Sequence, residues 1–275
     1  MTETLEDAGP AALWHYTDVH GLMGIIESSR LRFGDAHFLN DRTERTYGLT
    51  VLKRVLDQSA LSHAAIEQIV RSLDPNINPL RLYLCAFSET TESISQWQRY
   101  GADGSGYCIG FDTLRLDALF GGDVWRRKML YTEEGQARAL RVDLSELATV
   151  DAQRALTTAW LVLGRLDDAL LELKNPWFAD EREWRYIKAV DATVDGTATD
   201  VVDTFVARGA YVRPFIALPP VSGTREAALL PVMKVICGPK LDFGLAQPSV
   251  KRFLHAHGYG ASVPVERSQL ADIWR

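Results

Sequence analysis

Three short clusters along the chain contain the side chains best suited to chemistry. They are Trp14–Thr17, Ser93–Trp97 and Glu181–Arg185, in that order. Polar and apolar residues alternate in each cluster, so a β-strand would project the polar set onto one face. An imidazole, hydroxyl groups and a carboxylate that converge in one cleft can hold a sugar and stabilise a developing positive charge. The pattern therefore favours glycosyl-transfer chemistry.

The third cluster contributes the carboxylates. Glu181 and Glu183 are two positions apart and point the same way on a strand, with Arg182 and Arg185 beside them. Trp184 indicates that this strand is half buried, and an internal strand with two carboxylates on one face is unusual unless they have a function. The structural alternative is a solvated charged edge with cross-strand salt bridges.

The first cluster places a histidine next to two hydroxyl groups. A lone His15 beside Trp14 would more often be a core residue with satisfied hydrogen bonds. Tyr16 and Thr17 follow it, and three consecutive polar-capable side chains on a short strand form a poor core, because each would need a buried partner. A functional role for this cluster is therefore favoured.

The hydroxyl group of the middle cluster is open to two interpretations. Ser95 lies within the cluster, and Ser88 lies just upstream in a segment that offers further hydroxyl groups. A turn with serine caps packed under a tryptophan is the structural alternative for at least one serine. The sequence leaves both serines as candidates.

The composition limits the class of protein. The 275 residues are 47% hydrophobic and 24% charged, which suits one large domain with a substantial core. The net charge of −6 argues against a protein that binds the phosphates of nucleic acid without regard to base sequence. A local basic groove is compatible with this charge.

Targeting and metal signals are absent from the sequence. No apolar run approaches the roughly 20 residues that span a bilayer, and the acidic start lacks the features of a signal peptide. We therefore expect a cytoplasmic protein with no membrane partner. Cys85, Cys108 and Cys237 are widely spaced in apolar surroundings, so we expect buried free thiols and no metal site.

The hydrophobic periodicity predicts the α+β class, with a mixed or antiparallel sheet core and peripheral helices. Strands are expected at residues 13–17, 31–33, 82–88, 104–112, 123–131, 181–187, 205–218, 232–236 and 261–265. Helices are expected at 19–28, 44–73, 133–174 and 248–257, of which 133–174 is a helical insertion. A disordered acidic leader, 1–11, is expected to precede a single domain, 12–275.

A series of short motifs spans almost the whole chain. They are Leu13–Thr17, Gly21–Ser28, Phe38–Asp41, Phe87-Ser88, Ser95–Trp97, Tyr100-Gly101, Gly110-Phe111, Glu181-x-Glu183-Trp184-Arg185 and Gly238-Pro239. In this combination they resemble the DUF2971 family of uncharacterised bacterial proteins. The family name implies no activity.

A more distant resemblance is to the ADP-ribosyltransferase superfamily and its DarT-like DNA-modifying branch. These enzymes place an Arg or His on a first strand, a Ser or Tyr hydroxyl on a second, and a Glu on a later strand. A second Glu or Gln often stands two positions before that Glu. His15, Ser95 (or Ser88), Glu183 and Glu181 occupy these places in order. The resemblance implies an ADP-ribosyltransferase-like fold and a transferase that consumes NAD as its substrate without a metal.

The resemblance also implies roles for individual residues. Glu183 would bind a ribose hydroxyl and stabilise an oxocarbenium-like C1′, and Glu181 would position or deprotonate the acceptor. His15 would hold the other ribose or a pyrophosphate oxygen. The side chains implied to contact NAD are His15, Tyr16, Thr17, Ser88, Ser95, Gln96, Trp97 and Tyr100, with Tyr16, Trp97 or Tyr100 stacking on nicotinamide.

The acceptor implied by this resemblance is a protein or a nucleic acid, as in toxins and bacterial defence effectors. With water as the acceptor, the enzyme would be an NAD glycohydrolase. The alternative from another class is a non-catalytic module that retains the cleft to sense a nucleotide or to contact a protein partner.

Overall fold

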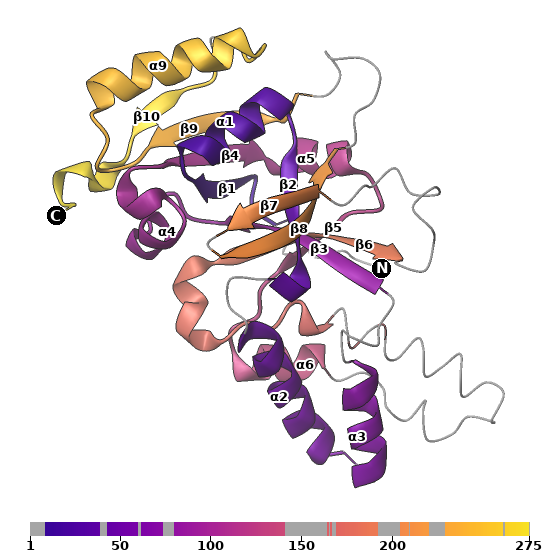
Figure 1. The fold of residues 1–275 in the computed structure, drawn as a ribbon. Coiled ribbons are helices and arrows are strands. Elements are labelled where there is room, and N and C mark those ends of the chain that lie inside the picture. The colour runs from indigo at the N-terminus through magenta and orange to yellow at the C-terminus, as the bar shows by residue number, and fades with distance from the viewer. Residues whose placement is uncertain are drawn as a thin grey trace, which may run out of the picture.

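The computed structural model describes residues 9–38, 43–59, 62–73, 80–140, 164, 166, 169–191, 204–208, 210–219, 229–260 and 262–274. Within these residues the strands form one open, ten-stranded sheet with helices packed around it (Figure 1). β10 pairs parallel with β9, and the other strand pairs of the described chain are antiparallel. The predicted α+β class with a mixed sheet is confirmed.

The strands run in an order unlike their order in the sequence. They are β1 (Ala12–Thr17), β2 (Leu31–Asp35), β3 (Leu80–Ser88), β4 (Tyr107–Asp112), β5 (Trp125–Lys128), β6 (Glu183–Asp191), β7 (Thr204–Arg208), β8 (Tyr211–Leu218), β9 (Val232–Cys237) and β10 (Val265–Arg267). Across the sheet the order is β10-β9-β4-β1-β3-β2-β8-β7, and β6 pairs with both β3 and β5. The N-terminal strand β1 is therefore central.

β3 is the branch point of the sheet. Along one edge it pairs with β6 over its whole length, from residue 80 to residue 88. Along the other edge it pairs with β2 at Tyr83 and Leu84 and with β1 at Ser88. At residues 85–87, between these two contacts, β3 has no strand partner on that edge in the described chain. The sheet therefore opens where β1 and β2 diverge.

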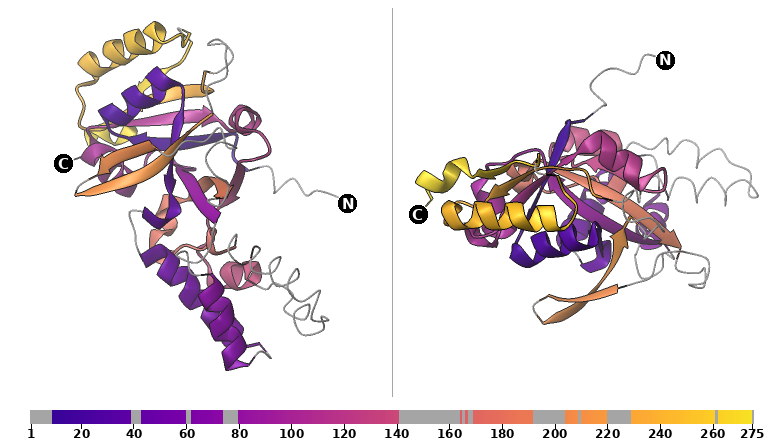
Figure 2. Two further views of the ribbon diagram at one scale, coloured as in Figure 1. Left: turned by 45° about the vertical axis from the view of Figure 1, so that its right-hand side comes forward. Right: turned by 90° about the horizontal axis from the view of Figure 1, so that it is seen from above.

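Side chains along β1 alternate between two faces of the sheet. Leu13 and His15 share the face of the largest core cluster, which α1 (Val19–Ser28) and α9 (Phe243–Ala256) cover side by side (Figure 2). Trp14 and Tyr16 share the opposite face, where Trp97 of α4 (Ile94–Arg99) packs. We call these the α1 face and the α4 face.

α1 forms where the sequence predicts it. Asp18 caps its first turn by accepting a hydrogen bond from the Gly21 amide at 2.7 Å, and Leu22, Ile25 and Ile26 bury one stripe of the helix. A Cβ at Gly21 would collide with the hydroxyl of Thr17, so glycine lets β1 and α1 approach closely. This junction holds the start of α1 against the residues that follow His15.

A second core cluster joins α2 (Thr43–Asp57), α3 (His63–Ser72), α6 (Glu133–Ala139), Leu166 and residues 169–173. We call these elements the helical lobe; Figure 1 shows them together below the sheet. The predicted helix at 44–73 is thus two helices. The predicted insertion, 133–174, begins with α6, while residues 141–163 lie outside the described residues. Residues 1–8 of the predicted leader also lie outside them, and the division into leader and domain stays a prediction.

The serine-cap alternative is borne out for the middle cluster, and the strand predicted at 181–187 begins two residues later than expected. Ser93 is the N-cap of α4, so the middle cluster is a helix, in which the serine hydroxyl satisfies the Gln96 amide. Glu181 is the last residue of the 3₁₀-helix η3 (Pro176–Glu181), and β6 begins only at Glu183. Arg182 links the two in a left-handed conformation, with φ of 43°.

The C-terminal helix also starts earlier than predicted. α9 begins at Phe243 with Asp242 as its N-cap, and Pro248 lies inside it. α5 (Thr113–Phe120), capped by Asp112, follows β4 directly.

No helix in the described part of the chain is both long and apolar enough to cross a membrane.

Candidate functional site

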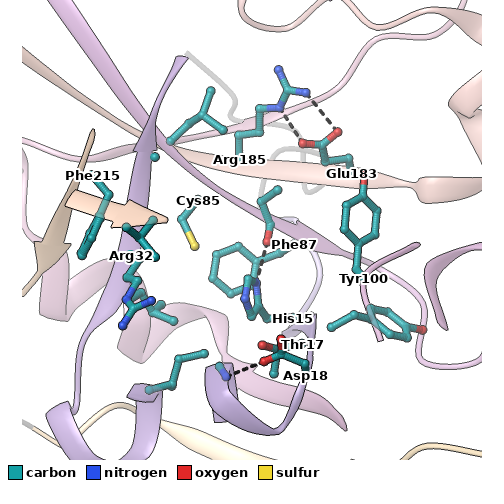
Figure 3. A pocket seen from close by; sticks show the side chains of 18 of the residues that line it. His15, Thr17, Asp18, Arg32, Cys85, Phe87, Tyr100, Glu183, Arg185 and Phe215 are labelled. Atoms are coloured by element: carbon teal, nitrogen blue, oxygen red, sulfur yellow. Dashed lines mark hydrogen bonds and ion pairs between the residues drawn. The ribbon is translucent and has the colours of Figure 1, made fainter. Parts of the chain in front are cut away.

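A pocket of about 640 Å³ lies where β1 and β2 diverge along β3 (Figure 3). It takes side chains from β1, α1, β2, β3, η3, β6 and the β7–β8 hairpin. Of the predicted site residues, those that line it are His15, Tyr16, Thr17, Ser88, Gln96, Tyr100, Glu181 and Glu183. Ser95 and Trp97 are not among its lining residues. Most of the predicted site residues therefore meet around one cavity.

His15 reaches into the opening of the sheet. Its Nδ1 lies 2.9 Å from the carbonyl oxygen of Ala86, one of the β3 residues without a strand partner on that edge. A carbonyl oxygen only accepts, so Nδ1 carries a hydrogen, and Nε2 is the acceptor nitrogen whenever the ring is neutral. The ring centroid lies 5.5 Å from that of Phe87. The backbone of β3 therefore sets the orientation of the imidazole.

His15 and Glu183 belong to opposite faces of the sheet. Trp14 pairs with Ser88 across β1 and β3, and Ser88 pairs with Glu183 across β3 and β6. Directly paired residues share a face, so Glu183 lies on the α4 face, whereas His15, next to Trp14, lies on the α1 face. Both line the pocket because the sheet is open between them.

Glu183 is held by two cations. Its Oε1 accepts from Arg185 Nε at 2.6 Å, its Oε2 accepts from Arg185 Nη2 at 3.1 Å, and Lys174 Nζ also donates to Oε2. All three side chains are buried. Burial alone would raise the pKa of Glu183, but the charges and hydrogen bonds of Arg185 and Lys174 outweigh it and lower the pKa below its ordinary value. Glu183 is therefore ionised at neutral pH.

Glu181 shares one of these cations. Lys174 Nζ donates to its Oε2, and Arg99 Nη1 donates to its Oε1 at 2.8 Å. The hydroxyl of Tyr100 lies 3.4 Å from the same Oε1. The Glu181 side chain is 3% exposed, whereas that of Arg99 is 44% exposed. Lys174 thus bridges both carboxylates, which share no strand. The structural alternative of a solvated charged edge is contradicted, because both carboxylates and Lys174 are buried.

Backbone contacts fix the segment that carries the two carboxylates. Ser88 is buried, and its hydroxyl donates to the Glu181 carbonyl at 2.7 Å and accepts from the Thr90 amide at 3.2 Å. The Glu183 amide donates to the Tyr131 hydroxyl at 2.9 Å. Burial raises the pKa of Tyr131, so this hydroxyl stays protonated at neutral pH. Ser88, rather than Ser95, therefore positions the carboxylate segment.

Ser95 and Trp97 have other contacts. The Ser95 hydroxyl donates to Asp180, and it lies 2.9 Å from the Ser93 hydroxyl. Trp97 is fully buried and meets the ring of Tyr16 edge-on at 4.9 Å. Trp97 therefore has no exposed ring face in this structure, and stacking of nicotinamide on Tyr16, Trp97 or Tyr100 stays a prediction. Tyr16 is also nearly buried, with its hydroxyl donating to the Thr90 carbonyl at 2.9 Å.

Three arginines line the pocket away from the carboxylates, and sequence reasoning missed them. Arg30 Nε donates to the Pro219 carbonyl at 2.9 Å, and its Nη2 donates to Ala217. Arg32 lies over the ring of Phe215, 5.0 Å from its centroid. Arg213 also lines the pocket. Figure 3 shows Arg32 and Phe215 on one side of the pocket and Glu183 on the other.

Lys174 was missed as well. It stands at the end of the predicted insertion, where the following Asn175-Pro176 pair marked only a helix end. Its partners Glu181 and Glu183 were singled out by their spacing, but nothing local in the sequence indicates that a lysine seven to nine positions upstream turns back onto them. The available signal in the sequence was the high density of charged residues in the segment 174–185, which suggests ion pairs within it.

Neither a cluster of potential metal ligands nor an exposed thiol is found among the described residues. No group of three or more His, Cys, Asp or Glu residues among them could hold a metal ion. The three cysteines are free and buried, and burial raises the pKa of Cys85 to about 12. Cys85 lines the pocket as a thiol and not as a nucleophilic thiolate.

Comparison with known families agrees with one of the two resemblances. Residues 96–186 match the family described as "Protein of unknown function (DUF2971)", which confirms the DUF2971 resemblance of the sequence. The matched segment runs from α4 into β6 and includes Lys174, Glu181, Glu183 and Arg185. No match is found for the chain among curated proteins or among solved structures.

Proposed function

We propose that the protein is an NAD-dependent ADP-ribosyltransferase whose reaction takes place in the pocket between β1 and β2. The observation that supports this proposal most is the convergence of His15, Ser88, Glu181 and Glu183, from distant segments, on one pocket of about 640 Å³. A pocket of that size falls within the range that holds small-molecule ligands and cofactors.

In the proposed reaction the bond between ribose C1′ and the nicotinamide nitrogen breaks, and its electron pair leaves with nicotinamide. C1′ then bonds to the acceptor, which loses a proton. C1′ is oxocarbenium-like in the transition state, as in glycoside hydrolysis. Glu183 accepts from a ribose hydroxyl and stabilises this charge, and Glu181 serves the acceptor. A carboxylate held in place before the reaction stabilises such a charge without having to reorganise.

The remainder of the pocket suits the rest of NAD. The arginines Arg30, Arg32 and Arg213 offer positive charge for the diphosphate, since guanidinium groups match phosphate oxygens in geometry and charge. In Figure 3 His15 lies between Arg32 and Glu183, a place suited to a ribose hydroxyl that donates to Nε2. The acceptor is a protein or nucleic acid, and with water the same chemistry gives an NAD glycohydrolase.

A second candidate is a non-catalytic nucleotide-binding module. The observation that favours it is that Lys174, Arg185 and Arg99 already engage all four carboxylate oxygens of the glutamate pair. A site of this kind binds a nucleotide through its arginines and leaves the glycosidic bond intact.

One experiment separates the candidates. Purified protein is incubated with NAD, and free nicotinamide is measured alongside the shift in melting temperature that ligand binding produces. Nicotinamide release that disappears in the folded fraction of Glu183→Gln supports the transferase, provided that it survives in Glu67→Gln, which changes an exposed glutamate on α3. Thermal stabilisation without release supports the binding module. If millimolar NAD causes neither nicotinamide release nor a shift in melting temperature, both candidates are wrong.

A further inference from the structure

Lys174 is a buried cation that the proposed reaction does not use. Its side chain is 4% exposed, and its Nζ donates to Oε2 of Glu181 and to Oε2 of Glu183. The same ammonium lies 5.5 Å from the ring centroid of Phe178, which also lines the pocket. Lys174 therefore occupies the space between the two carboxylates that the reaction needs.

An ammonium in this position opposes the charge that the reaction develops. The transition state places positive charge on a ribose held by Glu183, and a second cation on the same carboxylate oxygen repels it. Arg185 donates to both carboxylate oxygens of Glu183, and Arg99 donates to Glu181. Each glutamate would thus keep an arginine partner if the lysine left.

The backbone of Lys174 is anchored to the helical lobe. Gln136 of α6 is fully buried, and its Nε2 donates to the Lys174 carbonyl at 2.8 Å and to the Leu130 carbonyl at 2.7 Å. Its Oε1 accepts from the hydroxyl of Tyr47 in α2 at 2.8 Å. The Lys174 amide donates to Leu130 at 3.1 Å. This chain of contacts connects the helical lobe to the carboxylates.

We propose that Lys174 is a removable cationic plug that keeps the Glu181–Glu183 pair in a resting state, with the helical lobe setting its position through Gln136. The inference rests on the proposed function and concerns regulation of the same site. NAD cleavage proceeds when the lysine side chain leaves the carboxylates and a ribose hydroxyl takes its place on Glu183.

The first test compares nicotinamide release by the wild type and by Lys174→Met. Removing the plug is expected to raise the rate at saturating NAD by about tenfold or more, because an opposing charge next to the reacting centre is lost. Lys53→Met, which removes one exposed lysine of α2, is the charge-matched control and should not change the rate. An unchanged or lower rate in Lys174→Met, with NAD still bound, overturns the plug.

The second test does not depend on the folding of a variant. Wild-type protein is acetylated briefly with an amine-reactive ester, with and without an NAD analogue whose ribose ring oxygen is replaced by carbon, and each lysine is read by mass spectrometry. Lys174 should be protected in the free protein and become reactive in the complex, while Lys53 reacts in both. Equal protection of Lys174 in the complex overturns the plug. Absence of NAD binding by wild type and Lys174→Met alike overturns the proposed function itself.

Discussion

The two sides of the pocket hold their charges in different ways. On the carboxylate side, Glu181 and Glu183 are buried and every oxygen is engaged by a cation. On the arginine side, Arg30 donates to backbone carbonyls and Arg32 lies over an aromatic ring, both of which are neutral partners. The first side is a network of ion pairs in which three cations engage two carboxylates, and the second side presents guanidinium groups to the pocket.

This difference between the two sides predicts which substitutions alter stability and which alter ligand binding. Removing one member of a buried ion pair leaves an uncompensated charge in a poorly solvated place, which costs far more than the pair contributes. Removing a guanidinium that has only neutral partners at the edge of a pocket should lower the free energy of unfolding little. It would, however, remove an attraction for phosphate. We therefore expect variants on the carboxylate side to change folding and variants on the arginine side to change affinity.

The largest effect is expected from Glu183→Gln. It leaves Arg185 and Lys174 buried opposite a neutral amide, so the free energy of unfolding should fall by about 3–5 kcal/mol. Nicotinamide release by the folded fraction should fall by about 10²–10³. Urea denaturation measures the stability, with Glu67→Gln as the exposed control. A loss of less than about 1 kcal/mol would contradict the buried network, since surface pairs contribute no more than that.

Acid should reproduce this loss in the wild type. The pKa of Glu183 is lowered in the folded state, so its contribution is fully present above its ordinary pKa of 4.5. The contribution is lost as the pH falls through the lower pKa of the folded protein. Urea melts between pH 7 and pH 3 should show wild type and Glu183→Gln converging in stability at the acid end. A constant difference across this range would show that Glu183 is not bound as an anion.

A smaller effect, on affinity alone, is expected from Arg32→Ala. Arg32 is exposed, so stability should change by no more than about 0.5 kcal/mol. The Kd for ADP-ribose should rise by about one to two orders of magnitude, because a hydrogen bond between a guanidinium and phosphate is worth about 1.5–3 kcal/mol. Calorimetric titration measures the Kd. Unchanged affinity, or a matching loss of stability, would remove the distinction between the two sides.

The smallest effects distinguish the two serines. Ser88→Ala removes a buried hydroxyl that donates to the Glu181 carbonyl, and it should cost about 1 kcal/mol of stability and lower activity by moving the carboxylates. Ser95→Ala removes a contact with Asp180 outside the pocket lining, and it should cost less and leave NAD binding unchanged. Parallel melts and nicotinamide assays compare them. The reverse order would identify Ser95 as the positioning serine.

Local signals in the sequence were sufficient for several elements. Asp18 and the apolar spacing of Leu22, Ile25 and Ile26 define α1, and period-two alternation defines β1. Most of the site residues predicted from the three clusters and their neighbours line the pocket, although they make up only a minority of its lining. Helix caps and hydrophobic periodicity depend on neighbours within a few residues, so they can be recognised without a structure. For the middle cluster the sequence left a serine-capped turn open as an alternative, and the structure has this alternative, with Ser93 as the N-cap of a short helix.

Only the tertiary structure decided how the site is assembled. His15 finds its backbone partner 71 positions away at Ala86, and Arg99 finds Glu181 82 positions away. Lys174 reaches both carboxylates because a 3₁₀-helix and a left-handed residue turn the chain back on itself. The opening of the sheet lets side chains from opposite faces meet. The physical reason is that sequence periodicity determines which residue types an element presents, whereas charge pairing depends on packing between distant segments, which no local pattern encodes.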